Sequence, residues 1–216
     1  MVQLVFSSLV GSRACGYHKK KSDYDVMVIY AEELNNLLGL EPVKDARQEI
    51  IGNADIQEIE IKKFLSLILD NNPRMLETLF SPIQYKHDNR YWSELNSIGV
   101  NCITQDLRKP YLGIIRDYMR KIENQEKDPM KLIYSLHRNL LTCMIALSDG
   151  EIILDMRTLK DLTGHSVSAM DWYEVAEEMI AEIEEMDSDI PEHIDQNTHT
   201  MANSLLLKIR SDCYVR

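Results

Sequence analysis

The stretch that decides the fold reads Leu4-Val5-Phe6-Ser7-Ser8-Leu9-Val10, then Gly11-Ser12-Arg13, and after a basic loop Ser22-Asp23-Tyr24-Asp25-Val26-Met27-Val28-Ile29-Tyr30. The two apolar runs predict strands, and a glycine-serine turn after a strand lets backbone N–H groups approach phosphate oxygens at the start of a short helix. Side chains alternate along a strand, so Asp23 and Asp25 project from one face, roughly 6–7 Å apart. Two hard carboxylates at that separation can share Mg²⁺ ions and a bound triphosphate.

Each part of this pattern has an ordinary explanation when it is taken alone. Most Gly-Ser pairs are turns, most Asp-x-Asp sequences are solvated strand ends, and a run such as Lys19-Lys20-Lys21 is usually a solvated loop. Together, in this order and between two apolar strands, the three parts favour a site for a nucleotide and a metal ion.

The pattern resembles the signature of the DNA polymerase β-like nucleotidyltransferase superfamily, in which Gly-Ser precedes Asp-x-Asp by a similar spacing. A second block is similar to a family of stand-alone predicted nucleotidyltransferases of bacteria and phages, some of which occur beside RNA-repair ligases. The residues of this block that match are Asp55, Lys63-Phe64, Asn72-Pro73, Leu76-Glu77 and Leu79-Phe80. The resemblance covers most of the chain, and its specific motifs lie before residue 100.

The fold implied is α+β, with a small mixed β-sheet nucleotidyltransferase domain at 1–105 and an α-helical domain at 106–216 that closes the active-site cleft. The resemblance also implies transfer of a nucleoside monophosphate from an NTP to an acceptor hydroxyl, with release of pyrophosphate. Asp23 and Asp25 would hold Mg²⁺ or Mn²⁺, and Asp55 would be the third carboxylate and a possible base. Glu58 and Glu60 are alternatives to Asp55, because a register shift of a few residues would exchange them.

The phosphates of the NTP are expected at the glycine-serine turn, on Ser12 and on the backbone N–H groups around Gly11 and Arg13. In the helical half, relatives carry a lysine and an arginine with the spacing of Lys131 and Arg138. The resemblance makes both residues candidate phosphate ligands, and a solvated basic stripe is the alternative.

Two further features of the matched motifs leave alternatives open. Cys15 stands where the family often has an aromatic residue, so no base or sugar stacking is inferred there. Asn72, Arg74 and Glu77 either line the cleft or serve as a helix cap and an intrahelical ion pair.

The pattern along the chain places strands near 2–10, 24–30 and 55–61. The connection between the last two can hold a helix at 32–38 and a strand at 47–51. Asn72-Pro73 predicts a helix start and Asp149-Gly150 a helix end, whereas 83–105 shows no clear pattern. Apolar residues at three-to-four spacing predict helices at 111–125, 130–148 and 171–186, and more weakly at 200–210.

The composition is that of a soluble globular protein, with 44% hydrophobic and 27% charged residues. No apolar run reaches the ~18 residues of a membrane span, so no membrane partner is expected.

The cysteines at 15, 102, 143 and 213 are widely spaced, which disfavours a zinc site and fits reduced thiols in a cytoplasmic protein. The net charge of −11 comes from residues 171–195, which hold 11 acidic residues and no Lys or Arg. In the rest of the chain, 24 acidic residues are balanced by 24 basic residues. A solvated acidic face explains this segment, and the overall charge argues against a long nucleic-acid groove.

Three functions are compatible with the sequence. The first is a Mg²⁺-dependent nucleotidyltransferase acting on an RNA end, a protein or a small molecule. The second is a catalytically inactive nucleotide-binding regulatory or antitoxin-like module. The third is an interaction protein whose acidic helix at 171–187 docks a basic partner. The three carboxylates favour the enzyme, while the acceptor, the preferred NTP and the oligomeric state are left open.

Overall fold

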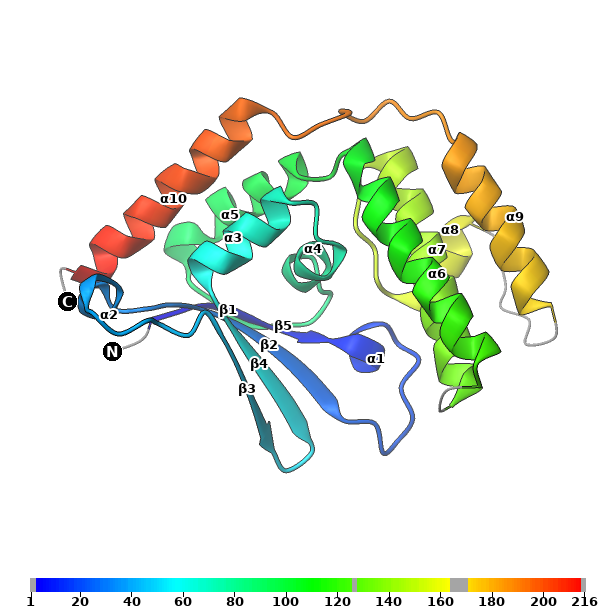
Figure 1. The fold of residues 1–216 in the computed structure, drawn as a ribbon, viewed down its shortest axis with the longest axis horizontal. Coiled ribbons are helices and arrows are strands. Elements are labelled where there is room, and N and C mark those ends of the chain that lie inside the picture. Colours follow the sequence, from blue (N-terminus) through cyan, green and yellow to red (C-terminus); the bar gives the residue numbers. More distant parts are fainter. Residues whose placement is uncertain (1–2, 126–127, 164–170, 215–216) are drawn as a thin grey trace.

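The structure is a computed structural model that describes residues 3–125, 128–163 and 171–214. Its N-terminal part is a five-stranded mixed sheet of order β3-β4-β2-β1-β5 (Figure 1). The central strand β2 (Tyr24–Ala31) pairs antiparallel with β1 (Gln3–Val10) and parallel with β4 (Ala54–Glu60). The edges are β3 (Ala46–Ile51), antiparallel to β4, and β5 (Gln84–His87), antiparallel to β1. The predicted α+β class is therefore confirmed.

Helices make up most of the rest of the described chain. They are α1 (Gly11–Ala14), α2 (Leu34–Leu38), α3 (Ile61–Leu69), α4 (Pro73–Leu79), α5 (Asn89–Asn101), the 3₁₀ turn η1 (Gln105–Leu107), α6 (Arg108–Glu123), α7 (Pro129–Asp149), α8 (Met156–Thr163), α9 (Trp172–Glu185) and α10 (Gln196–Tyr214). The predicted helices correspond to α2, α4, α6, α7, α9 and α10. The sequence pattern does not predict α5, α8 or β5.

Local sequence signals set several helix ends. The Asn72 side chain accepts a hydrogen bond of 3.3 Å from the backbone N–H of Met75, and Pro73 occupies the first helical turn of α4. In the helical half, α7 ends before Gly150, which takes the left-handed conformation with φ +69°. Both predicted signals are confirmed, because Asn72 satisfies a backbone N–H at the start of α4 and Gly150 takes the left-handed conformation at the end of α7.

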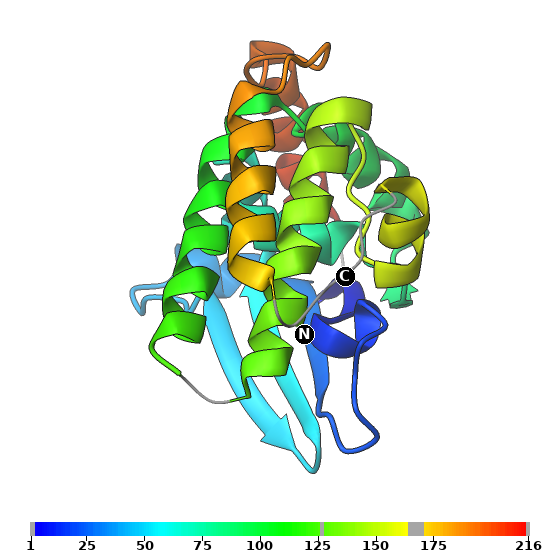
Figure 2. The ribbon, with the colours of Figure 1, turned by 90° about the vertical axis from the view of Figure 1, so that its right-hand side faces the viewer.

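The helices build one continuous core with the sheet. Phe6 of β1 meets Phe64 of α3 edge to face, with ring centroids 5.3 Å apart, and Met27 and Ile29 of β2 are fully buried on the face that the helices cover. Figure 1 shows α3 and α4 on this side of the sheet, with α10 lying across α3 and α5. Figure 2 shows α6, α7 and α9 side by side, with α1 beside the lower part of α7. The division at 105/106 falls at η1 and stays a prediction.

Two predictions about the chain's environment can be compared with the fold. None of the described helices has both the length and the apolar character that crossing a bilayer requires. Cys15, Cys102 and Cys143 are buried free thiols, and the Cys213 side chain lies outside the described part. Burial raises the pKa of the Cys15 thiol to about 11, which makes it an unreactive core residue.

Candidate active site

Asp25 and Asp55 lie side by side on neighbouring parallel strands. Asp25 of β2 is the register partner of Asp55 of β4, and Asp23 stands just before β2. Register partners project from the same face of a sheet, and this is the face on which Met27 is buried under the helices. The parallel pairing thus brings two of the predicted carboxylates together where the sheet meets the helical half.

The structure distinguishes Asp55 from Glu58 and Glu60, the two other candidates for the third carboxylate. Glu58 is the partner of Val28, so it projects from the opposite face to Asp25. Glu60 is buried, accepts a hydrogen bond of 2.8 Å from the N–H of Lys62 at the start of α3, and forms a 2.6 Å ion pair with Arg210 of α10. The geometry therefore favours Asp55 as third carboxylate, and its role as a metal ligand stays a prediction.

Burial and the neighbouring charges shift the pKa of the Asp25 carboxyl. Burial raises the pKa of the Asp25 carboxyl, and the negative charges of Asp55 and Asp23 raise it further, while Lys131 and Arg74 act in the opposite direction. A half-buried carboxylate beside two others is a local excess of negative charge that a hard divalent cation would neutralise.

Gly11 holds the turn against Asp25. Its φ of +68° is in the left-handed region, and a Cβ atom built on it would lie 2.3 Å from the Asp25 Oδ2 atom. No other residue fits there without moving the carboxylate. The next residue, Ser12, is buried at the start of α1. A glycine is therefore required at position 11, because the turn lies close to the Asp25 carboxylate of β2.

The side chain of Arg13 is bound to the loop that precedes β2. Its Nε donates to the carbonyl oxygens of Ser22 and Asp23, both at 3.1 Å, and its Nη2 donates to Ser22 at 2.7 Å. The guanidinium also stacks on the Tyr24 ring, 3.8 Å from the centroid. The Arg13 side chain thus fixes the loop that leads to Asp23 and Asp25, while the expected contact of its backbone N–H with phosphate stays a prediction.

The carboxylate of Asp55 is held by an amide on the edge strand. Gln48 Nε2 of β3 donates to both Asp55 oxygens, at 2.8 and 3.0 Å. Across the described part of the chain, no three His, Cys, Asp or Glu side chains are gathered closely enough to hold a metal ion. The donor set of Asp23, Asp25 and Asp55 fits Mg²⁺ by chemistry, because all three side chains are carboxylates, and in this arrangement both oxygens of Asp55 accept from Gln48.

Lys131 and Arg138 of α7 line different hollows. Lys131 is exposed and lies with Ser12, Lys19 and Tyr134 around a small pocket of about 80 Å³. Arg138 is buried and forms a 2.6 Å ion pair with Glu77 of α4. The structure thus places Lys131 beside Ser12 of the glycine-serine turn and joins Arg138 to a carboxylate, while the role of both as phosphate ligands stays a prediction.

Glu77 and Arg74 do not form the intrahelical pair that the sequence left open. Arg74 Nη2 donates to Gln57 of β4 at 2.6 Å, while Glu77 accepts a 3.1 Å hydrogen bond from the Tyr111 hydroxyl in addition to its pair with Arg138. Both residues line a cavity of about 400 Å³ that also reaches Gly11 and Asp25. Other residues of its wall carried no sequence signal, namely Thr78, Ile114, Tyr118, Asn139 and Leu154.

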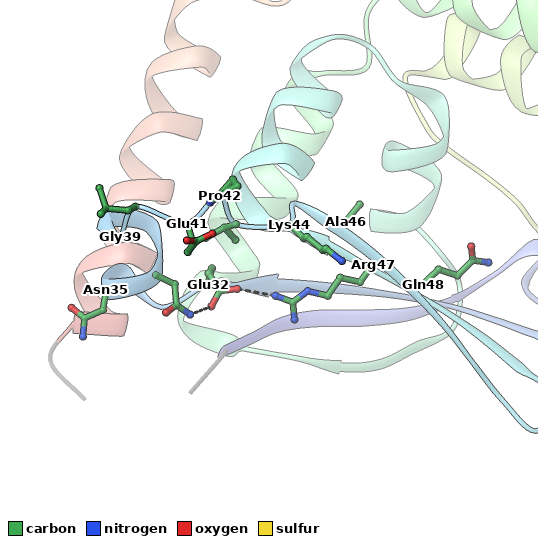
Figure 3. A pocket seen from close by; sticks show the side chains of 12 residues that line it. Glu32, Asn35, Gly39, Glu41, Pro42, Lys44, Ala46, Arg47 and Gln48 are labelled. Carbon is green, nitrogen blue, oxygen red and sulfur yellow. Dashed lines mark hydrogen bonds and ion pairs between the residues drawn. The ribbon is translucent and has the colours of Figure 1, made fainter.

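A larger hollow lies at the far end of β2. It has a volume of about 890 Å³ and is formed by the segment that contains α2 and by the start of β3 (Figure 3). Its buried carboxylate, Glu32, accepts hydrogen bonds from Arg47 at 3.0 Å and from Asn36 at 2.8 Å. Because these contacts already satisfy the carboxylate, this hollow offers no reactive group comparable with Asp25.

Comparison with known proteins gives three findings. The sequence matches the RNA repair pathway DNA polymerase beta family over residues 1–181. It is 29% identical over 154 residues to the uncharacterized protein YcgL of Bacillus subtilis (strain 168), covering 70% of this chain and 59% of that protein's length. A crystal structure of a nucleotidyltransferase-like protein from Exiguobacterium sibiricum 255-15 aligns with 97% of this chain and 69% of its own, at 12% identity and a TM-score of 0.30, a likeness too low to support an argument.

Proposed function

The chain belongs to the RNA repair pathway DNA polymerase beta family, and from this premise we propose that it is an NTP-dependent nucleotidyltransferase. In the proposed reaction, the oxygen of an acceptor hydroxyl bonds to the α-phosphorus of an NTP. The bond from that phosphorus to the β-phosphate oxygen breaks, and pyrophosphate leaves. The observation that carries the proposal is the pairing of Asp25 with Asp55 on adjacent parallel strands, with the Gly11 backbone packed against Asp25.

The proposed roles follow from position and charge. Asp23, Asp25 and Asp55 would hold Mg²⁺ or Mn²⁺, which when bound would neutralise the triphosphate and lower the pKa of the attacking hydroxyl. Ser12 and Lys131, which share the small pocket beside the turn, would bind the β- and γ-phosphates. Asp55 would accept the proton of the hydroxyl. Such a reaction requires mainly positioning and charge neutralisation from the protein.

The acceptor of the proposed transfer is an RNA end, a protein or a small molecule. The name of the family refers to RNA repair, which supports an RNA end as the first candidate. The net charge of −11 fits a short contact with an RNA terminus better than a long groove along the strand.

The test is label transfer from each α-³²P-labelled NTP, with Mg²⁺ or Mn²⁺, to total RNA or to cell lysate. We expect one acceptor to become labelled, and we expect Asp23→Asn or Asp25→Asn to abolish the label. Glu58→Gln is the matched control, because it removes a carboxylate from the opposite face of the same sheet. Transfer that survives Asp25→Asn would refute the proposed chemistry.

A second candidate is a nucleotide-binding regulatory or antitoxin-like module without turnover. Two observations favour it. Both Asp55 oxygens contact Gln48, and among the described residues no three carboxylates are gathered closely enough to hold a metal ion. The labelling experiment separates the two functions when it is combined with a binding measurement. NTP binding without transfer to any acceptor supports the module, and transfer supports the enzyme.

A further inference from the structure

The strand β3 is an exposed edge of the sheet that is open to further pairing. All six of its residues are exposed, Ile50 to 72% and Ile51 to 55%. An open, regular edge strand with apolar side chains pairs readily with another strand, so natural proteins usually protect such edges. The opposite edge, β5, has this protection, because it is four residues long, its register with β1 shifts between Ser7 and Ser8, and it carries Lys86. The pairing of β3 with β4 runs residue for residue, without such a shift.

The backbone groups that β3 leaves unpaired follow from its register with β4. The N–H of Glu60 donates to the carbonyl oxygen of Asp45 at 2.9 Å, and these two residues are register partners one step beyond Ala46. In an antiparallel pair, residues that direct their backbone groups at the partner strand alternate with residues that direct them away. The N–H and C=O groups of Ala46, Gln48 and Ile50 therefore point away from β4, to the open edge.

The charges of β3 make the strand complementary to an antiparallel copy of itself. When Gln48 lies opposite Gln48 of a second copy, Arg47 of each copy lies opposite Glu49 of the other. These are the closely spaced positions of an antiparallel pair, with Cα atoms about 4.5 Å apart. The smallest shift that keeps the outward backbone groups together is two residues, and it places either two Arg47 or two Glu49 side chains directly opposite. Like charges in that position are destabilising, so the charges select the register centred on Gln48.

Both charged side chains are available for such a pair. The side chain of Arg47 is 42% exposed, and its Nη2 donates to Glu32 at 3.0 Å (Figure 3). A guanidinium has five N–H donors, so others remain for a second carboxylate. Glu49 is exposed, and within the described part of the chain it has no hydrogen bond or ion pair.

The same register brings an exposed isoleucine to the hollow of about 890 Å³ beside the start of β3. Ala46 lines that hollow together with Val43 and Lys44. In the register centred on Gln48, Ile50 of the second copy lies opposite Ala46, and side chains of opposite residues on one face are in contact. Ile50 thus lies at the mouth of the other copy's hollow and is withdrawn from water, which favours the pairing.

We propose that the protein forms a symmetric dimer in which the β3 strands of two copies pair antiparallel about Gln48 and join the two sheets into one. Two backbone hydrogen bonds link the two Gln48 residues, and two more link Ala46 of each copy to Ile50 of the other. The two-fold axis lies beside the candidate active sites, because Gln48 also donates to both Asp55 oxygens. The dimer goes beyond the proposed function and does not depend on it, since mass and cross-linking test it.

The first test is sedimentation equilibrium of the full chain. We expect the natural chain to change from monomer to dimer between about 1 and 100 µM, a range of Kd that fits a small interface. Glu49→Arg replaces both ion pairs by like-charge pairs, and it should raise the dimer Kd by about tenfold or more, which corresponds to about 1.4 kcal/mol. Glu182→Arg makes the same change of charge at an exposed position of α9, and it should leave the Kd unchanged.

The second test locates the two-fold axis by cross-linking. Hydrogen-bonded partners in an antiparallel pair have Cα atoms about 5.5 Å apart, a distance that a disulfide spans. In a chain that carries Cys213→Ser, the remaining cysteines are buried. Mild oxidation of Gln48→Cys in this background should give a covalent dimer. Tyr85→Cys, exposed on the opposite edge strand, is the matched control and should remain monomeric.

Three results would overturn the inference. A natural chain that is monomeric at about 100 µM would leave the β3 edge to a strand of another protein. A dimer that Glu49→Arg does not weaken and Gln48→Cys does not cross-link would have its interface elsewhere. Weakening by Glu49→Arg without cross-linking of Gln48→Cys would place the two strands in another register. Circular dichroism identifies the variants that fold, and the mass of the natural chain tests the dimer without any variant.

Discussion

Substituting Gly11 by alanine tests the contact that joins the turn to the carboxylates. The added Cβ would lie 2.3 Å from Asp25 Oδ2 and 3.0 Å from its Cγ, whereas ordinary contacts begin at 3.4 Å. The Asp25 side chain or the turn must therefore move by about 1 Å. A displacement of that size in an active site costs about 10²-fold in rate. We expect Gly11→Ala to reduce label transfer by about that factor.

The same substitution also strains the backbone, and a second glycine measures this effect separately. Gly11 has φ +68°, and an alanine in this region costs about 1–2 kcal/mol, which lowers the melting temperature of a chain of this size by about 2–8 °C. Gly52, in the turn between β3 and β4, has a similar φ of +63° but no atom within 4 Å of its added Cβ. Gly52→Ala is therefore the matched control for backbone strain.

The assay measures melting temperature and the initial rate of label transfer for both variants. We expect similar losses of stability and a loss of rate confined to Gly11→Ala. Equal rates in the two variants would refute the reasoning, because the close approach to Asp25 would then have no role in the chemistry. A Gly11→Ala variant as stable as the natural chain would contradict the strain argument.

The remaining predictions concern a carboxylate, a loop contact and an ion pair. Asp55→Asn should lower the transfer rate by about 10²-fold or more, because it removes the proposed metal ligand and proton acceptor, whereas Glu58→Gln on the opposite face should change it by less than about twofold. Arg13→Gln should lower kcat without raising KM for the NTP, because it releases the loop before β2; a raised KM at constant kcat would show a phosphate ligand instead. The exposed His193 has its pKa raised by a hydrogen bond to the Asp106 carboxylate, so the protonated ring stabilises the fold below the ordinary value of 6.5, and this stabilisation is lost as the pH rises through the raised pKa. His193→Gln should therefore lower the melting temperature at about pH 5.5 but not at about pH 9, and an equal loss at both would exclude the ion pair as its cause.

The sequence was sufficient to predict the elements that carry the first two carboxylates. The apolar run 26–29 behind Asp25 predicts a buried strand, and the stretch 55–61 predicts a second strand with fewer apolar residues. Parallel pairing of the two strands brings Asp25 and Asp55 together. The sequence could not predict Gln48 as the partner of Asp55, because all six residues of β3 are exposed and give no apolar alternation that would fix the register.

The contacts between the two halves were also beyond local sequence signals. Glu77 and Arg138 come from different helices far apart in the chain, and their pairing depends on how α4 and α7 pack. A pattern of residues at helical spacing identifies the face that is apolar but not the neighbour that covers it. For this reason the sequence left Glu77 as either a cleft residue or part of an intrahelical pair.

The contact of α10 with the sheet half affects how the protein folds during synthesis. The family match ends at residue 181, yet Arg210 pairs with Glu60 and donates to the Glu32 carbonyl oxygen at 3.2 Å, while α10 covers α3 and α5. A ribosome releases the sheet before it releases this helix, so the nascent first half carries an uncovered apolar surface and an unneutralised Glu60 until α10 has been synthesised. Chains shortened at the family boundary would keep that surface permanently and would aggregate.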